Sequence, residues 1–169
     1  RGIQVASMSF GSASSPLDSE NQGDNGSGSE ARLVNDAGNA AIVCVVAMGN
    51  DGTNRVPSPA SADKAISIGA ATDRGNINRT NDDVADYSNT GPRLDDSDDD
   101  EWDELKPDIT AYGSDIMSAT AQTGTSFPGQ PAKPLAGSDY DSKDGTSMAT
   151  PIASGIVALM LQADPSLEP

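Results

Sequence analysis

Apolar and polar positions along the chain follow two different periods. The run at 41–48 is apolar on both faces, which is typical of a strand covered on each side in a parallel sheet. A second apolar stretch at 65–72 predicts another strand, and 3–10 predicts a short extended segment. Between the segment 3–10 and the strand 41–48, apolar residues recur at helical spacing from about 29 to 41, which predicts a helix. Strands that alternate with helices predict an α/β layered sheet.

The second half of the chain is richer in turns. Residues 85–92 have turn composition, and short apolar stretches lie at 108–111 and 115–117. The segments 12–28 and 120–144 are rich in Gly, Ser and other loop-forming residues and predict long loops. The last element is a helix from about Thr146 to Gln162, with one apolar stripe made of Ile152, Ile156, Leu159 and Met160.

Composition narrows the function classes. The 169 residues are enough for one domain, and the formal net charge of −16 argues against nucleic-acid binding, which needs positive charge. No run of eighteen apolar residues is present, so we expect no membrane span. Cys44 stands alone inside an apolar run and is expected to pack as a small buried hydrophobe.

The charge is uneven, because the acidic insert at 94–104 holds eight of the 26 acidic residues and no basic one. A solvated loop is the simplest interpretation. Clustered carboxylates also supply hard oxygen ligands, so a structural calcium ion is the alternative, although the spacing does not match an EF-hand loop.

Ser147 lies where a glycine-led turn enters the last helix. Gly145 permits a backbone geometry that a side chain would obstruct. The free N–H groups and the dipole at a helix N-terminus favour negative charge that develops there. An ordinary N-cap serine would look similar, so this position alone does not establish a nucleophile.

Six motifs, in order, carry a resemblance to the subtilisin-like serine proteases. "GTSMATPIASG" (145–155) resembles the family's nucleophile motif, "AMGNDG" (47–52) its oxyanion-hole segment and "SMSFG" (7–11) its substrate-binding strand. Residues 57–72, "DYSNTGP" and "KPDITAYG" resemble the intervening pocket wall, F-S-x-x-G-P and K-P-D-[IV]-x-A-P-G. The resemblance implies a three-layer α/β fold with a mostly parallel sheet, present here as the C-terminal part of a catalytic domain that includes residues 1–169.

The resemblance also implies roles for individual residues. Ser147 would be the nucleophile, and the side-chain amide of Asn50 would donate to the oxyanion of the tetrahedral intermediate. Ser9, Phe10 and Gly11 would bind an extended peptide through their backbones. Ala47, Met48 and Gly49 would form another wall of the first specificity pocket, with Met48 narrowing it. Pro59, Ala60 and Ser61 would lie beyond this wall.

A serine protease of this type needs Asp, His and Ser in working geometry, but this chain contains no histidine. In the family, the Asp and His motifs precede the substrate-binding strand, so we expect both from an N-terminal segment of the same precursor. This chain alone would then be inactive. The resemblance implies a protein or peptide substrate, an extracellular or cell-surface location and no cofactor for the chemistry; it is compatible with a propeptide and with a structural calcium ion.

Two other interpretations stay open. A sedolisin-type acid peptidase uses Glu and Asp with a similar serine motif, but its oxyanion residue is normally aspartate and here it is Asn50. A pseudoprotease would keep the scaffold for binding, but it has no need to keep Gly145, Ser147 and Asn50 together. Two departures from the family pattern, Ile152 for histidine and Tyr112 for proline, affect packing and a local turn only.

Overall fold

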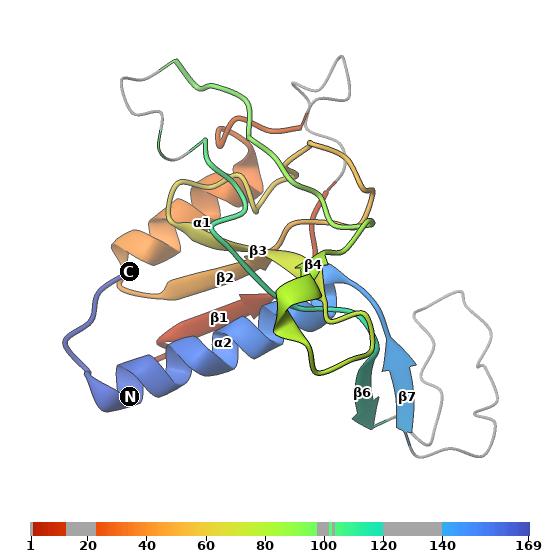
Figure 1. The fold of residues 1–169 in the computed structure, drawn as a ribbon. Helices are drawn as coiled ribbons and strands as arrows, with labels where there is room; N and C mark the ends of the chain where they lie inside the picture. Colours follow the sequence, from red (N-terminus) through yellow and green to blue (C-terminus); the bar gives the residue numbers. More distant parts are fainter. Residues whose placement is uncertain (1, 13–22, 98–101, 103, 120–139) are drawn as a thin grey trace, which may run out of the picture.

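A five-stranded sheet lies between two helices in the computed structural model, which describes residues 2–12, 23–97, 102, 104–119 and 140–169 (Figure 1). Strand β1 (Val5–Met8) pairs in parallel with β2 (Val43–Ala47), and β2 pairs in parallel with β3 (Ala65–Thr72). Strand β5 (Ile109–Tyr112) also runs parallel to β3, and the short β4 (Asp83–Val84) is antiparallel to it. The predicted α/β class with a mostly parallel sheet is confirmed.

Strand β2 separates two cores because its side chains alternate between the faces of the sheet. Cys44, Val46 and Met48 pack toward α1 (Ser29–Asn39) with Ala31 and Val34. Val43 and Val45 lie in the second core with Ala149 and Ala153 of α2 (Thr146–Ala163). All five strand residues are buried, as the unbroken apolar run predicted. The molecule therefore has three layers, and Figure 1 shows α1 and α2 on opposite sides of the sheet.

The lone cysteine is a packing residue. Cys44 is fully buried in the α1-side core, and its thiol is free. Burial raises the pKa of this thiol because the thiolate would lose its hydration. The expectation of a small buried hydrophobe is confirmed.

The polar segments contain more regular structure than expected. Strand β7 (Tyr140–Lys143) pairs antiparallel with β6 (Ile116–Ala119), so the predicted loop at 120–144 is wrong for its last residues, while 120–139 lie outside the described residues. A 3-10 turn, η1 (Arg79–Asn81), and β4 also form within the polar stretch after β3. Strand β7 is exposed along its length and β4 is exposed too, so neither has the apolar face that reveals a strand in a sequence.

The face of α2 that packs on the sheet is not the predicted one. Ala149 and Ala153 are buried, with Val157 and Leu161 packed beside them. The predicted stripe is exposed by 39% to 65%; its members are Ile152, Ile156, Leu159 and Met160. Because α2 is apolar nearly all round, spacing alone could not tell which stripe meets the sheet.

Candidate active site

Ser147 is the second residue of α2, directly after a turn that needs glycine. Gly145 has φ of +147°, a conformation that a side chain would strain. Its N–H donates to the Gly113 carbonyl at 2.8 Å, which ties the turn to the end of β5. As a first-turn residue, Ser147 has a backbone N–H with no acceptor inside the helix. The turn thus presents both a half-buried hydroxyl and a free N–H at one point.

Asn50 follows β2, and the start of α2 fixes its side chain. The Oδ1 atom of Asn50 accepts the Thr146 N–H at 2.8 Å and the Thr146 hydroxyl at 3.0 Å. Both partners are donors, so the oxygen of the amide must face Thr146. The Nδ2 group is then the end of the exposed side chain that remains to donate to another molecule.

Ser147 and Asn50 face the same cavity. The cavity has a volume of about 300 Å³, and its lining consists of Phe10, Gly11, Ala47, Gly49, Asn50, Asp51, Pro57, Thr146 and Ser147. The hydroxyl and the amide therefore converge on a single space, as catalysis at one carbonyl group requires.

The structure brings most of the predicted substrate-binding residues to this cavity. Phe10, Gly11, Ala47 and Gly49 line it, and Phe10 is 62% exposed. Met48 is different: its side chain is fully buried in the α1-side core, so it does not narrow the cavity as expected. The cause is the alternation of side chains along β2, which continues through Met48 and directs it away from α2.

The residues expected to lie beyond this wall of the specificity pocket do not contact the cavity. Pro59, Ala60 and Ser61 are buried and do not line the cavity, whereas Pro57 does.

Ser9 is tied to Ser147 by two hydrogen bonds. The Ser9 hydroxyl donates to the Ser147 carbonyl at 3.0 Å, and the Ser147 hydroxyl donates to the Ser9 carbonyl at 3.4 Å. Within a helix, the Ser147 carbonyl would accept the N–H of residue 151, but Pro151 has none. The proline thus leaves a carbonyl that Ser9 uses to anchor the start of α2 to the end of β1.

Residues that sequence reasoning missed hold this arrangement in place. The Thr146 hydroxyl also accepts the Gly49 N–H at 3.1 Å. The Tyr87 hydroxyl accepts the Gly145 N–H at 3.2 Å and donates to the Gly113 carbonyl at 2.8 Å. Thr146 lies inside the nucleophile motif, so its position was a signal. Tyr87 lies in the segment that resembles F-S-x-x-G-P, and nothing in that pattern indicates contact with Gly145.

The two ends of the acidic insert are held together by a buried arginine rather than by an evident metal site. The Arg93 side chain is fully buried and pairs with Asp63, with Asp96 at 3.1 Å and with Glu104 at 3.8 Å. The carboxylate oxygens of Asp95, Asp96 and Glu104 lie within 4.8 Å of one another. Calcium binds about six to eight oxygen ligands. Because the guanidinium already neutralises two of these three carboxylates, this group does not fit a calcium shell; residues 98–101 and 103 lie outside the described residues.

A mostly parallel sheet between helices, with a serine at a helix N-terminus and an amide donor at the adjacent strand end, is the arrangement that a serine-nucleophile site of an α/β protein would need. The family model described as "Subtilase family" matches residues 1–169. The chain belongs to the subtilase family.

Individual relatives agree with this assignment. The chain is 36% identical over 169 residues to Serine protease AprX of Bacillus subtilis, covering 99% of this chain and 35% of that protein. It is 32% identical over 165 residues to Subtilisin Savinase of Lederbergia lenta, covering 98% of this chain and 44% of that protein. The solved structure of Sphericase matches with a TM-score of 0.65 and 26% identity, covering 97% of this chain and 44% of that one. The chain thus spans less than half the length of these relatives.

Proposed function

We propose that this chain is the part of a serine endopeptidase that carries the nucleophile and the oxyanion hole. The observation that supports this most directly is the common cavity of Ser147 and Asn50. The chain contains no histidine, so the base and the aspartate that orients it come from an N-terminal segment of the same precursor.

The proposed chemistry is acyl transfer. The Ser147 Oγ atom attacks the peptide carbonyl carbon while its proton passes to the histidine of the N-terminal segment. The developing oxyanion accepts hydrogen bonds from Asn50 Nδ2 and from the Ser147 N–H. The intermediate then collapses, the histidine protonates the departing amine, and water hydrolyses the ester on Ser147 by the same route. In this chain the Ser147 hydroxyl instead donates across 3.4 Å to Ser9, a long bond that it can leave readily.

The cavity limits the substrate in a simple way. Ala47 and Gly49 are small, and Pro57 is apolar, so the pocket suits an apolar or mixed side chain. The exposed Phe10 and the neighbouring Gly11 stand at the cavity edge, where an extended peptide would bind by strand addition. We propose a protein or peptide substrate outside the cell or at its surface. The tripeptides that begin at Asn25 and Asn78 fit the N-glycosylation sequon, but such tripeptides are common by chance and add little support. One relative, from Xanthomonas campestris, is itself named "Extracellular protease".

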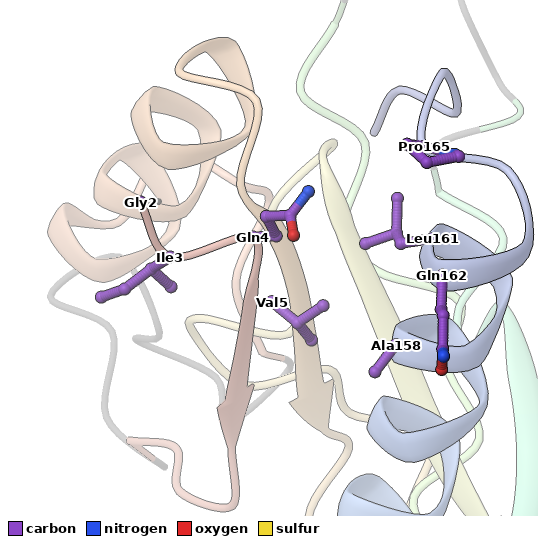
Figure 2. Close-up of a pocket in the computed structure, with 8 residues that line it drawn as sticks. All are labelled: Gly2, Ile3, Gln4, Val5, Ala158, Leu161, Gln162 and Pro165. Atoms are coloured by element: carbon purple, nitrogen blue, oxygen red, sulfur yellow. The ribbon is translucent and has the colours of Figure 1, made fainter.

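The N-terminal segment would dock on the opposite end of α2 and on β1. Among the described strands, β1 pairs with β2 alone, so its other edge is free to accept a strand. A cavity of about 800 Å³ lies beside it, lined by Gly2, Ile3, Gln4, Val5, Ala158, Leu161, Gln162 and Pro165. In Figure 2, Val5 of β1 and Ala158 and Leu161 of α2 face this space.

The exposed apolar stripe of α2 adjoins this docking surface. By length and a mean hydropathy of 1.3, α2 would pass as a membrane span, and 22% of it is buried. Core helices of globular proteins pass the same test. Since the chain covers 35% of AprX and lacks the catalytic base, we assign the stripe to the N-terminal segment rather than to lipid.

Two further binding partners belong to the proposal. A propeptide would bind the complete enzyme, and any structural calcium ion would bind outside the Arg93 cluster.

Reconstitution tests the proposal. The precursor's N-terminal segment is mixed with this chain, and Ser147 is probed with a fluorophosphonate, which labels only an activated serine. Labelling of the complex but not of the chain alone is expected; no labelling of the complex would contradict an endopeptidase and favour a pseudoprotease. A pH–rate profile with its maximum near about pH 4 would instead favour the sedolisin-type mechanism.

A further inference from the structure

Asn89 lies outside the predicted site but contacts the loop that carries Asn50. Its side chain is fully buried. The Asn89 Nδ2 group donates to the Met48 carbonyl at 3.1 Å, and Oδ1 accepts the Asp51 N–H at 3.0 Å. The backbone N–H of Asn89 donates to the Gly49 carbonyl at 3.1 Å. These contacts lie on both sides of Asn50 in the sequence.

Two residues, Thr146 and Asn89, therefore hold different groups of the loop at 48–51, which we call the oxyanion loop. Thr146 fixes the Asn50 side chain and the Gly49 N–H from the start of α2. Asn89 fixes the backbone before and after Asn50. The approach is close: Gly49 has φ of +96°, and a Cβ atom there would stand 2.8 Å from Asn89 Nδ2. The loop can take this shape only because residue 49 is glycine.

The quoted family pattern does not specify the residue that makes this contact. Asn89 is the first unspecified residue in F-S-x-x-G-P, to which "DYSNTGP" corresponds. An amide is well suited to the position because it offers one donor to Met48 and an acceptor to Asp51 at once. An aliphatic side chain would leave both of these backbone groups without that partner.

We propose that Asn89 is a positioning residue for the oxyanion hole: it fixes the backbone on both sides of Asn50 and so directs the Asn50 Nδ2 group at the substrate carbonyl. The proposal rests on the proposed endopeptidase function. A hydrogen-bond donor in the oxyanion hole accelerates the reaction most when it already points to the position where negative charge develops in the transition state. A displacement of about 1 Å can cost about a hundredfold in rate, so loss of Asn89 should lower kcat about ten- to a hundredfold. The ground-state substrate depends less on this donor, so KM should change less than about twofold.

A double-mutant cycle in the full-length enzyme separates this role from simple packing. The acylation rate and KM are measured for wild type, Asn89→Ala, Asn50→Ala and the double variant with a chromogenic peptide substrate. If Asn89 acts through Asn50, its substitution should cost little once Asn50 is alanine. Ser67→Ala is the matched control, because Ser67 is also fully buried and its hydroxyl donates to Asp108 at 2.6 Å, in a strand that does not line the cavity.

Each outcome of this cycle either supports or overturns the positioning role of Asn89. A fall in kcat that disappears in the Asn50→Ala background supports the proposal, provided that Ser67→Ala keeps wild-type kcat. Additive effects, or an unchanged kcat in folded Asn89→Ala, overturn it. If Asn89→Ala does not fold, Asn89→Asp keeps the volume and the acceptor for Asp51 but removes the donor to Met48, and the same cycle is run with it. Absence of fluorophosphonate labelling in wild type would instead refute the proposed function.

Discussion

The helices α1 and α2 begin alike and differ in what surrounds them. Each follows a glycine, Gly28 or Gly145, and each has a serine in its first turn. The N-terminus of α1 is closed, because the Ala31 N–H donates to the buried Ser58 hydroxyl at 3.1 Å. The N-terminus of α2 opens instead onto the cavity of about 300 Å³.

The outer faces of the two helices differ as well. Only a narrow face of α1 is buried, and most of the rest of the helix is polar. The outer face of α2 carries exposed Ile, Leu and Met side chains in addition to its packed inner face. A helix that is apolar all round normally lies inside a protein. Under the proposed function, α2 would become the central helix of the complete enzyme when the N-terminal segment binds, whereas α1 would stay on its surface.

The largest expected difference in activity is between substitutions of the serines in the first turns of α2 and α1. Replacing Ser147 with alanine in the full-length enzyme should abolish fluorophosphonate labelling and lower kcat about a millionfold, the loss measured when subtilisin loses its nucleophile. Ser29→Ala is the matched control: Ser29 is exposed and its hydroxyl contacts Glu30 at 3.1 Å, so activity should not change. Equal effects of both substitutions would mean that α2 has no special chemical role.

The second largest effect is expected from one of two asparagines, Asn50 near the start of α2 and Asn35 in α1. Asn50→Ala should lower kcat about a hundred- to a thousandfold with little change in KM, which is the range known for the oxyanion asparagine of subtilisin. Asn35 of α1 makes comparable contacts, donating to Asp63 at 2.8 Å and accepting the Lys64 N–H at 3.0 Å. Steady-state kinetics of Asn35→Ala should match wild type, and a kcat loss there comparable with that of Asn50→Ala would contradict the assignment.

A charge on the outer face of each helix tests the docking surface. Ile156 of α2 is 54% exposed and Leu33 of α1 is 67% exposed in this chain. Ile156→Asp should weaken binding of the N-terminal segment about a hundredfold or more, because an apolar side chain worth about 1.5–3 kcal/mol on burial is replaced by a carboxylate. Leu33→Asp should leave binding unchanged. Titration calorimetry of the separate segments measures both; tight binding by Ile156→Asp would place the N-terminal segment elsewhere.

These contrasts show which features a sequence can reveal. The strand β2 was predictable because all its positions are apolar, and Ser147 and Asn50 were predictable because short motifs surround them. The packed stripe of α2 was not, since several faces of this helix are apolar and spacing alone does not tell which of them meets the sheet. Met48 was misplaced because motif position does not give side-chain direction. Asn89 was missed because its contacts join residues about 40 positions apart along the chain, and such pairing depends on the fold.

The smallest expected effect lies at the helix ends. Helix α1 ends with the Ala40 N–H bonded to backbone carbonyls, whereas α2 ends at Asp164, whose carboxylate accepts the Ser166 N–H at 3.0 Å and its hydroxyl at 2.6 Å. Both hydrogen bonds lower the pKa of Asp164 below its ordinary value of 3.8, and the bond from the Ser166 hydroxyl contributes more than the bond from the Ser166 N–H.

Ser166→Ala should therefore raise the pKa of Asp164 toward its ordinary value, which an NMR titration of the carboxyl carbon measures. A lowered pKa in the folded state means that the ionised form contributes stability above the unfolded-state pKa, and that this contribution is lost as the pH falls through the folded-state pKa. The small stability difference between wild type and Ser166→Ala should accordingly be present at neutral pH and vanish in acid. Ser29→Ala, at the start of α1, should leave the Asp164 titration unchanged. A wild-type pKa for Asp164 at or above the ordinary value would show that Ser166 does not close this end of α2.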